Sequence, residues 1–170
     1  DGFVCRWNIQ TGNIKEMKLV TRRRAHDGSA MVVSISPDGD TIVTGGGDKV
    51  IKIWSQFLEP CQTLEGHSRY VTSLAFSPCG QILVSGSNDQ SLRVWARSDM
   101  EHISFQNIAS SSESLAEKRF QVLLSKSQNR QIGTLSGHSL DVTSLDSRDS
   151  MIVSGCADSL VRVWRWSESE

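Results

Sequence analysis

The chain has 170 residues and a formal net charge of −1, with 18 Lys and Arg side chains against 19 Asp and Glu. This balance excludes a bulk electrostatic attraction to nucleic acid or to an acidic membrane surface. No apolar run approaches the length of a membrane-spanning helix, and no charged-then-apolar leader opens the chain. The composition therefore favours a globular domain that is long enough to bury a core.

The four cysteines, Cys5, Cys61, Cys79 and Cys156, are scattered, and no Cys-x-x-Cys pair occurs. This spacing indicates neither a disulfide framework nor a zinc site, so we expect no metal and no cofactor. It favours a reducing intracellular compartment, cytoplasmic or nuclear. Cys5 and Cys156 fall in strand-like runs, where we expect them to behave as small buried hydrophobic residues.

Short apolar runs between turn signals predict β-strands along almost the whole chain. The first strands are expected at 4–9 and 16–20, and Thr21–His26, with its three arginines, is expected to form a loop. Further strands are expected at 30–35, 41–44, 50–54, 61–64, 71–76, 82–85, 92–95 and 131–135. Three more in the last 34 residues give thirteen strands in all.

These strands belong to a segment that recurs along the chain. In the middle copy, Asp89 follows His67 by 22 positions and Trp95 follows Asp89 by six. The same spacing connects His26, Asp48 and Trp54, whereas the gap between His138 and Asp158 is 20, with Trp164 again six further on. The chain opens on the tail of another copy, from Asp1 to Trp7. The fold is therefore built from repeated antiparallel meanders.

A repeat of about 40 residues with Gly-His early and Trp late resembles the WD-repeat family of β-propellers. The resemblance implies an all-β fold of four-stranded blades in one propeller segment. Its repeats would cover 1–24 in part, 25–65, 66–136 with an insertion at 98–131, and 137–170. Thirteen strands make about three full blades and the tail of another. Such a number cannot close a ring, so we expect a larger propeller whose remaining blades lie outside these residues.

His67, Ser85 and Asp89 are the residue types of a nucleophilic triad. A hydrolase needs one such arrangement with an oxyanion hole, however, and these types recur in every repeat without a Gly-x-Ser-x-Gly elbow. The resemblance instead implies a structural hydrogen-bond network in each blade, and we expect no catalytic residue. The networks would comprise His26, Thr44, Asp48 and Trp54; His67, Ser85, Asp89 and Trp95; and His138, Ser154, Asp158 and Trp164.

The resemblance implies a non-catalytic protein–protein interaction scaffold that presents peptide- or domain-binding loops on one face of the propeller. Arginine and aromatic side chains are typical anchors of such contacts. The candidate partner-binding residues are therefore Arg69, Tyr70 and Asn88, and at matching places in the last repeat Leu140 and Asp141.

The alternative is a substrate-recruiting or regulatory arm of a larger enzyme such as a ubiquitin ligase or a kinase. None of the strand-end tryptophans is followed by Asp, so the Trp-Asp-x-Arg signature of adaptor docking is absent. Other proteins or peptides are the expected partners, and no membrane. Nucleic acid fits poorly, because the Arg22–Arg24 run has no aromatic interleaving.

Trp54 and His67 are 13 positions apart, but Trp95 and His138 are 43 apart, so about 30 residues are inserted. Ser114 and Glu117 have the spacing of a capping box and predict a short helix over 115–124. The serines at 110–112 and 114 are candidate phosphorylation sites. We expect residues 98–128 to be dispensable for folding, because a short turn can join the flanking strands.

Overall fold

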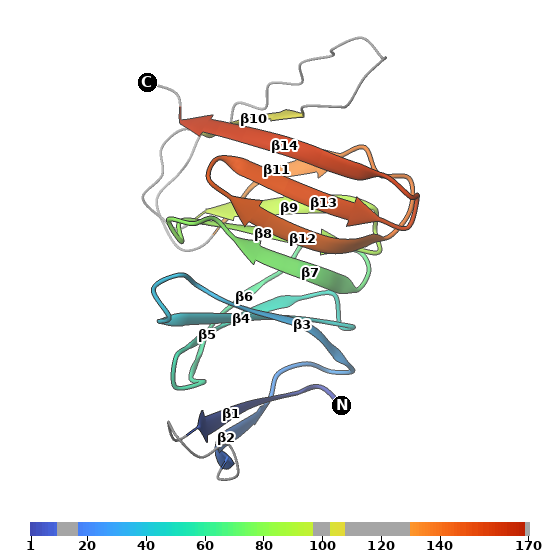
Figure 1. The fold of residues 1–170 in the computed structure, drawn as a ribbon. Coiled ribbons are helices and arrows are strands. Elements are labelled where there is room, and N and C mark those ends of the chain that lie inside the picture. Colours follow the sequence, from blue (N-terminus) through green and yellow to red (C-terminus); the bar gives the residue numbers. More distant parts are fainter. Residues whose placement is uncertain (10–16, 97–102, 108–129, 169–170) are drawn as a thin grey trace.

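A computed structural model describes residues 1–9, 17–96, 103–107 and 130–168, and these residues form fourteen β-strands (Figure 1). The strands are β1 (Phe3–Ile9), β2 (Met17–Arg24), β3 (Ala30–Ile35), β4 (Thr41–Gly46), β5 (Ile51–Ser55), β6 (Pro60–Leu64), β7 (Val71–Phe76), β8 (Ile82–Ser87), β9 (Ser91–Ala96), β10 (Ile103–Asn107), β11 (Arg130–Ser136), β12 (Val142–Arg148), β13 (Met151–Cys156) and β14 (Val161–Glu168). The all-β class expected from the sequence is confirmed.

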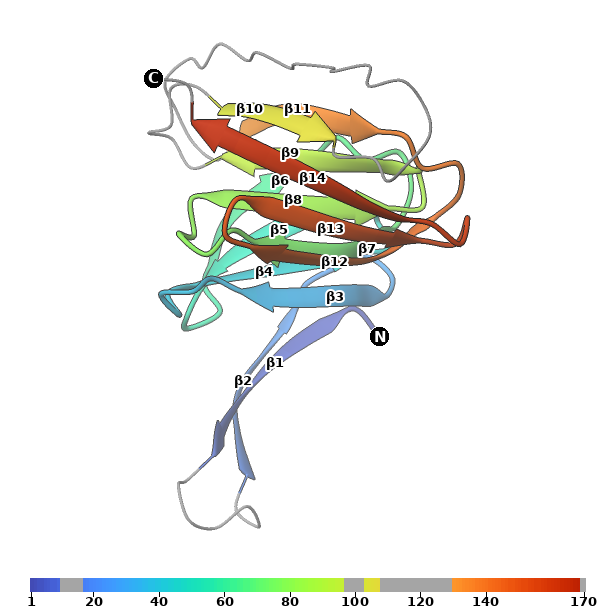
Figure 2. The same cartoon turned by 45° about the horizontal axis from the view of Figure 1, so that its top comes forward.

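The strands form one two-stranded and three four-stranded antiparallel sheets. The two-stranded sheet is β1-β2. The first full sheet is β3-β4-β5-β6, the second is β7-β8-β9-β11, and the third is β12-β13-β14-β10. β7 contacts β3 on one side and β12 on the other, so the first strands of the three full sheets lie next to one another. Figures 1 and 2 show the sheets as a stack, and within the described residues this stack does not close into a ring.

The first two full sheets each have a tight turn after their first strand. In the first full sheet, the amide of Gly39 donates to the carbonyl of Ser36 at 2.9 Å, and Ser36 Oγ contacts Asp38. Gly39 has φ +80°, a conformation that glycine adopts without steric cost. Gly80 has φ +71° and bonds in the same way to Ser77. These turns set the register, and the strands expected at 30–35 and 71–76 occur with those bounds.

The arginine run differs from the expectation. Arg22, Arg23 and Arg24 lie in β2 and pair with Cys5, Val4 and Phe3 of β1. The loop expected over Thr21–His26 is therefore wrong for residues 21–24, because β1 supplies backbone partners up to Arg24, while residues 25 and 26 follow the strand. Cys5 is exposed on this narrow sheet rather than buried, and Cys156 is half-buried. The expectation of two buried cysteines is therefore also wrong.

The insertion contributes a strand that the sequence reading missed. β10 lies within residues 98–131 and pairs with β14, from Ile103 opposite Glu168 to Asn107 opposite Trp164. It thereby provides the fourth strand of the third full sheet, for which only three strands were expected. β11 resumes after the insertion and completes the second full sheet along β9. The helix predicted over 115–124 and the serine cluster lie outside the described residues.

Buried side chains pack mainly between neighbouring sheets. One cluster joins Val43 and Ile53 of the first full sheet to Leu74 and Leu83 of the second. Another joins the second sheet to Ile152 and Trp164 of the third. A Cβ on Gly86 would lie only 2.6 Å from a methyl carbon of Val142, so this close approach of two sheets requires glycine.

The outer faces of this stack carry exposed apolar side chains. Val33 and Ile35, on β3, are each 59% exposed, and Val161, on β14, is 65% exposed. These exposed apolar side chains agree with the expectation that further blades complete a larger propeller. Ile152, on β13, is by contrast only 1% exposed, because it faces the second full sheet.

Candidate functional site

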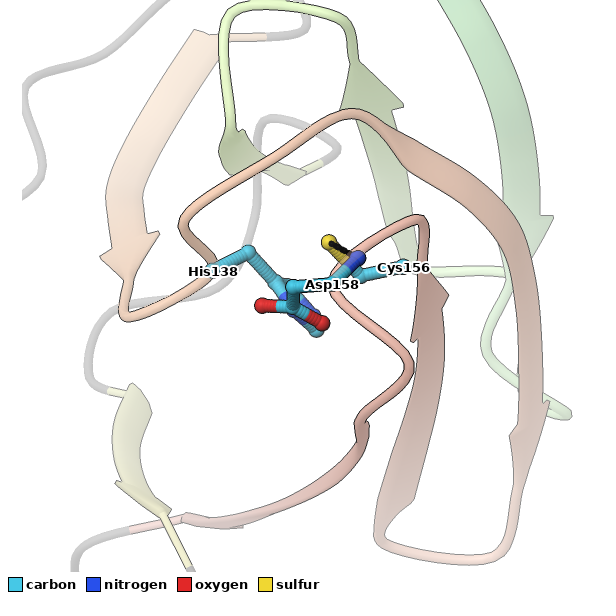
Figure 3. Close-up of side chains that lie close together, drawn as sticks. All are labelled: His138, Cys156 and Asp158. Carbon is cyan, nitrogen blue, oxygen red and sulfur yellow. Dashed lines mark hydrogen bonds and ion pairs between the residues drawn. The ribbon is translucent and has the colours of Figure 1, made fainter.

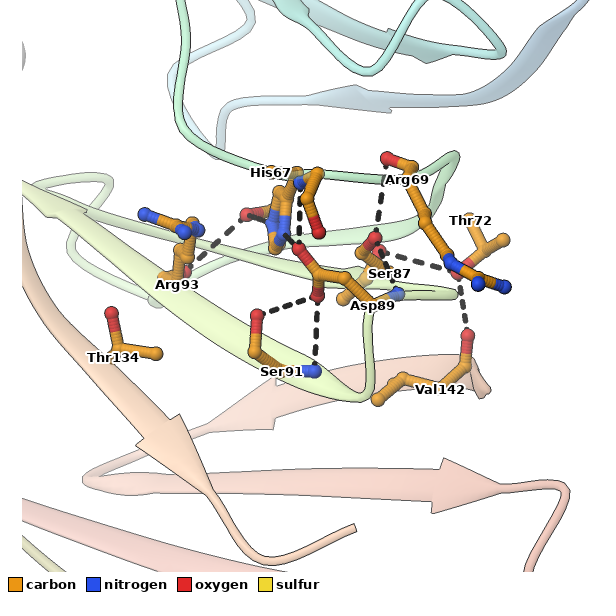
Figure 4. A network of polar contacts seen from close by, with 12 residues as sticks. His67, Arg69, Thr72, Ser87, Asp89, Ser91, Arg93, Thr134 and Val142 are labelled. Carbon is orange, nitrogen blue, oxygen red and sulfur yellow. Dashed lines mark hydrogen bonds and ion pairs between the residues drawn. The ribbon is translucent and has the colours of Figure 1, made fainter. Parts of the chain in front are cut away.

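The second full sheet contains the clearest of the polar networks (Figure 4). His67, in the loop before β7, lies with its Nδ1 2.8 Å from Asp89 Oδ2 and its Nε2 2.7 Å from Ser85 Oγ. The indole of Trp95 donates to the same hydroxyl at 2.9 Å. The loop before the sheet is thus connected to the turn between β8 and β9 and to the end of β9.

The protons of this network follow from its donors. With Nδ1–H donating to the carboxylate, Nε2 accepts from Ser85, whose oxygen accepts from Trp95, and every polar atom is satisfied. Burial is the largest influence on His67 and, opposed by Asp89, lowers its pKa. Burial alone would raise the pKa of Asp89, but hydrogen bonds from Ser91 and His67 outweigh it and lower this pKa to about 2. A neutral imidazole beside an ionised carboxylate is therefore the stable state.

The first full sheet repeats this arrangement with a threonine hydroxyl. His26 Nδ1 lies 2.8 Å from Asp48 Oδ1, and its Nε2 lies 2.9 Å from Thr44 Oγ1. The indole of Trp54 donates to Thr44 at 3.0 Å. The amide of Asp27 donates to Asp48, as the amide of Ser68 does to Asp89.

The third full sheet brings the same residue types together with one change. His138 Nε2 lies 2.7 Å from Ser154 Oγ, and Trp164 donates to that oxygen at 3.1 Å. His138 Nδ1 is 3.5 Å from Asp158, however, because Arg162 donates to both. Burial and the Arg162 charge lower the pKa of His138. Burial would raise the pKa of Asp158, but hydrogen bonds, first from the Ser139 amide, hold it below the usual range.

Three potential metal ligands gather in this third network (Figure 3). The ligand atoms of His138, Cys156 and Asp158 lie within 4.8 Å of one another. Cys156 Sγ donates to the carbonyl of Leu140 at 3.2 Å and accepts from the Asp158 amide at 3.4 Å. A guanidinium contacts two of the three ligands, so the charge of a metal ion is already supplied by Arg162. These three side chains therefore stabilise the turn between β13 and β14 through their hydrogen bonds.

The position of the hydroxyls bears on the triad hypothesis. Ser85 and Ser154 are 0% exposed and Thr44 is 1% exposed. Each hydroxyl accepts from an indole and contacts an imidazole inside the sheet. A nucleophile has to reach a substrate carbonyl. These hydroxyl oxygens are instead surrounded by the indole and imidazole groups that they contact. The geometry therefore suits structural connection rather than acyl transfer.

The candidate partner-binding residues lie in loops at the end of the sheets where His67 and His138 enter the networks. The amide of Asn88 donates to the carbonyl of Tyr70 at 3.1 Å, and that of Ala157 to Asp141 at 2.9 Å. Tyr70 is 50% exposed and Leu140 48% exposed, and Arg69 is exposed beside them, whereas Asn88 and Asp141 are half-buried. The sequence reading missed Leu160, which is 52% exposed on the turn of Asp158. The sequence signal that could have identified Leu160 is its position as an apolar residue directly after the polar turn at Asp158.

The matches to a known protein family coincide with the repeats described above. A family model described as "WD domain, G-beta repeat" matches residues 17–55, 58–96 and 129–165. The chain belongs to the WD-repeat family. Its membership confirms the resemblance seen in the sequence, and WD-repeat propellers are in general non-catalytic scaffolds for protein interaction. Within the described residues, no helix has the length and apolar character to cross a membrane.

Solved structures agree with this assignment at the level of the fold. The chain is similar to a structure titled "Crystal structure of RRP9 WD40 repeats", with a TM-score of 0.71 and 24% identity. It is also similar to "Structure of U3-55K", with a TM-score of 0.68 and 25% identity. In both comparisons 96% of this chain covers 42% of the other. A computationally designed protein, Ika4, has a TM-score of 0.67 and 25% identity, with 97% of this chain covering 80% of it.

Proposed function

We propose that this WD-repeat segment is a non-catalytic scaffold that binds peptides or folded domains through the loops before β7 and β12. The observation that carries the proposal is the exposed pair of Tyr70 and Leu140 on backbone that is fixed by hydrogen bonds to the neighbouring turns. Rigid loops lose little conformational entropy on binding, and exposed aromatic residues commonly anchor interfaces. Arg69 and Asn88 add hydrogen-bonding groups beside Tyr70, and Asp141 does so beside Leu140.

Affinity purification with matched variants tests this proposal. Tyr70→Ala removes the central side chain, and Phe57→Ala removes an equally exposed aromatic from the turn between β5 and β6, at the other end of the sheets. We expect a partner that is retained by the wild type and by Phe57→Ala and lost with Tyr70→Ala. The partner is then purified and its affinity for the three proteins measured. Equal affinity for all three overturns the assignment of the loops.

Two further proposals accompany this function. Additional blades would cover the exposed apolar residues on β3 and β14, because exposed apolar patches of this kind usually mark a contact surface. An intracellular location is supported by four free cysteines in separate parts of the fold. The alternative of a recruiting arm for a larger enzyme uses the same loop face. The identity of the purified partner separates it from a plain scaffold.

A further inference from the structure

A cavity of about 310 Å³ lies between the first and second full sheets. Its walls include Trp54 on β5, Trp95 on β9 and Phe76 at the end of β7. Tyr70 immediately precedes β7, so the cavity lies at the opposite end of the sheets from the loop face. Its volume is at the lower end of the range for small-ligand sites and suits a single large side chain.

The next interface in the stack shows why this cavity is open. In the first full sheet, Thr41 pairs with Ser55, whereas at the same register of the second full sheet Ile82 pairs with Ala96. Thr41 and Ser55 line the cavity, and Ile82 and Ala96 are buried in the core cluster against the third full sheet. Two polar side chains thus stand where a larger apolar pair packs in the neighbouring repeat.

The outer strands of the first and second full sheets also differ at a bulge that lies beside the cavity in the first. Cys61 lies where the pairing of β6 with β5 shifts, and Ile132 lies at the corresponding shift between β11 and β9. Ile132 is 3% exposed within the core cluster, but Cys61 is exposed and lines the cavity. Two side chains that are smaller than those of the neighbouring repeat, Thr41 in place of Ile82 and Cys61 in place of Ile132, therefore leave the cavity accessible, and its walls retain the two tryptophans.

The charge at the cavity is negative. Asp40 is exposed on its rim, where the second repeat has Gln81. The amide of Gln56 donates to Asp40 Oδ1 at 3.1 Å, which leaves the negative charge in place. Across the part of the chain that the structure describes, no cationic side chain forms an ion pair with Asp40. Aromatic and aliphatic walls beside a carboxylate that has no cationic partner among the described residues complement an apolar group with a cation next to it.

We infer that this cavity is a second binding site, which takes a leucine- or phenylalanine-sized side chain of a partner peptide with a lysine or arginine beside it. The apolar side chain contacts Trp54 and Trp95, and the cation reaches Asp40. This site is independent of the proposed loop face, because it lies at the other end of β7 and uses none of the same residues.

Disulfide exchange at Cys61 tests the site with defined probes. The probes are 3-mercaptopropionyl-Leu-Lys amide, the Leu-Glu amide and the Ser-Lys amide, each offered as a mixed disulfide with 2-mercaptoethanol. Mass spectrometry measures the concentration of 2-mercaptoethanol at which half of Cys61 remains labelled by the probe. Cys5, exposed on β1 outside the cavity, is the control within the same molecule. We expect the Leu-Lys probe to withstand about tenfold more reductant than the Ser-Lys probe at Cys61, and the same amount at Cys5.

Two variants and their controls complete the test. Thr41→Ile fills the cavity as Ile82 does in the second repeat, so it should abolish the preference at Cys61; Thr63→Ile, on the exposed part of β6, should not. Asp40→Asn should remove the preference for Lys over Glu, while Asp149→Asn keeps it. Asp40→Asn leaves the apolar walls intact and keeps the test usable if Thr41→Ile does not fold. Equal labelling of Cys61 and Cys5 by all probes overturns the site, and equal retention of the Lys and Glu probes overturns the cationic partner.

Discussion

The second and third full sheets contain the same four network residue types, but their protons are arranged differently. His67 contacts Asp89 directly at 2.8 Å, whereas Arg162 stands between His138 and Asp158 and donates to both. The arginine at the matching place in the second sheet, Arg93, donates instead to Gln131 on β11. In the second full sheet, the outer strand therefore supplies the partner of this arginine.

The two arginines also differ in the described pairing of the outer strand beside them. β11 pairs with β9 from Ser91 to Ala96 and so passes beside Arg93. The pairing of β10 with β14 ends at Trp164, two residues short of Arg162. Within the described residues, no group of β10 accepts from Arg162, and this half-buried guanidinium donates to the nearest carboxylate. Similar short motifs therefore differ in electrostatics together with the partner that each arginine takes.

Removal of each histidine should have the largest effect and should separate the two networks. His67→Ala leaves buried Asp89 without its imidazole donor and Trp95 without part of its network, a loss of about 1–3 kcal/mol in unfolding free energy or more. His138→Ala should fall at the lower end of that range, because Arg162 still donates to Asp158. Urea denaturation of the two variants measures the difference. Curves that overlay the wild type would contradict the network interpretation.

Replacement of the insertion tests the contribution of the outer strand. The sequence alone predicts that a Gly-Ser turn in place of residues 98–128 changes the melting temperature by only a few degrees. The structure shows that this change removes β10, so we expect a loss of about 1–2 kcal/mol and faster hydrogen exchange along β14. A control that replaces only 108–128 by a Gly-Ser segment of equal length retains Ile103–Asn107. Equal stability of both variants would restore the original prediction.

Acidification should weaken both networks in the same direction. The pKa of His67 and that of His138 are lowered from 6.5 in the folded protein, so below about pH 6.5 the unfolded chain binds more protons. Stability should therefore fall as the pH decreases below this value. Asp89, with its pKa lowered from 3.8 to about 2, adds a second loss between these values. Urea midpoints of the wild type and of His67→Gln from pH 8 to pH 5 measure the first loss, which should be smaller in the variant.

Substitution of the arginines should have the smallest effect on stability and the most specific effect on protonation. Arg162→Gln removes a positive charge that lowers the pKa of His138, so this pKa should rise and Nδ1 should become free to donate to Asp158. Arg93→Gln should raise the pKa of His67 less, because burial and Asp89 influence that group more strongly than Arg93 does. Imidazole titration by NMR compares the two shifts. A larger shift at His67 would contradict the proposed difference.

The sequence by itself determined the meanders, their turns and the residues that meet in each network. These features are local: alternating apolar residues and turns such as Ser36–Gly39 fix short antiparallel strands, and a recurring order of His, Asp and Trp, with a constant Asp-to-Trp spacing of six, brings the same side chains together. The recurrence of this pattern was sufficient to predict the all-β class and the WD-repeat family before any contact was known.

Only the tertiary structure decided where the less regular segments go. Whether Arg22–Arg24 form a loop or a strand depends on the length of β1, and β10 pairs with a strand more than 50 residues away along the chain. The cavity at Trp54 and Trp95 likewise depends on how two sheets pack, since Cys61 reads in the sequence as an ordinary strand residue. Edge pairing and packing between sheets are non-local, so a periodic pattern carries no record of them.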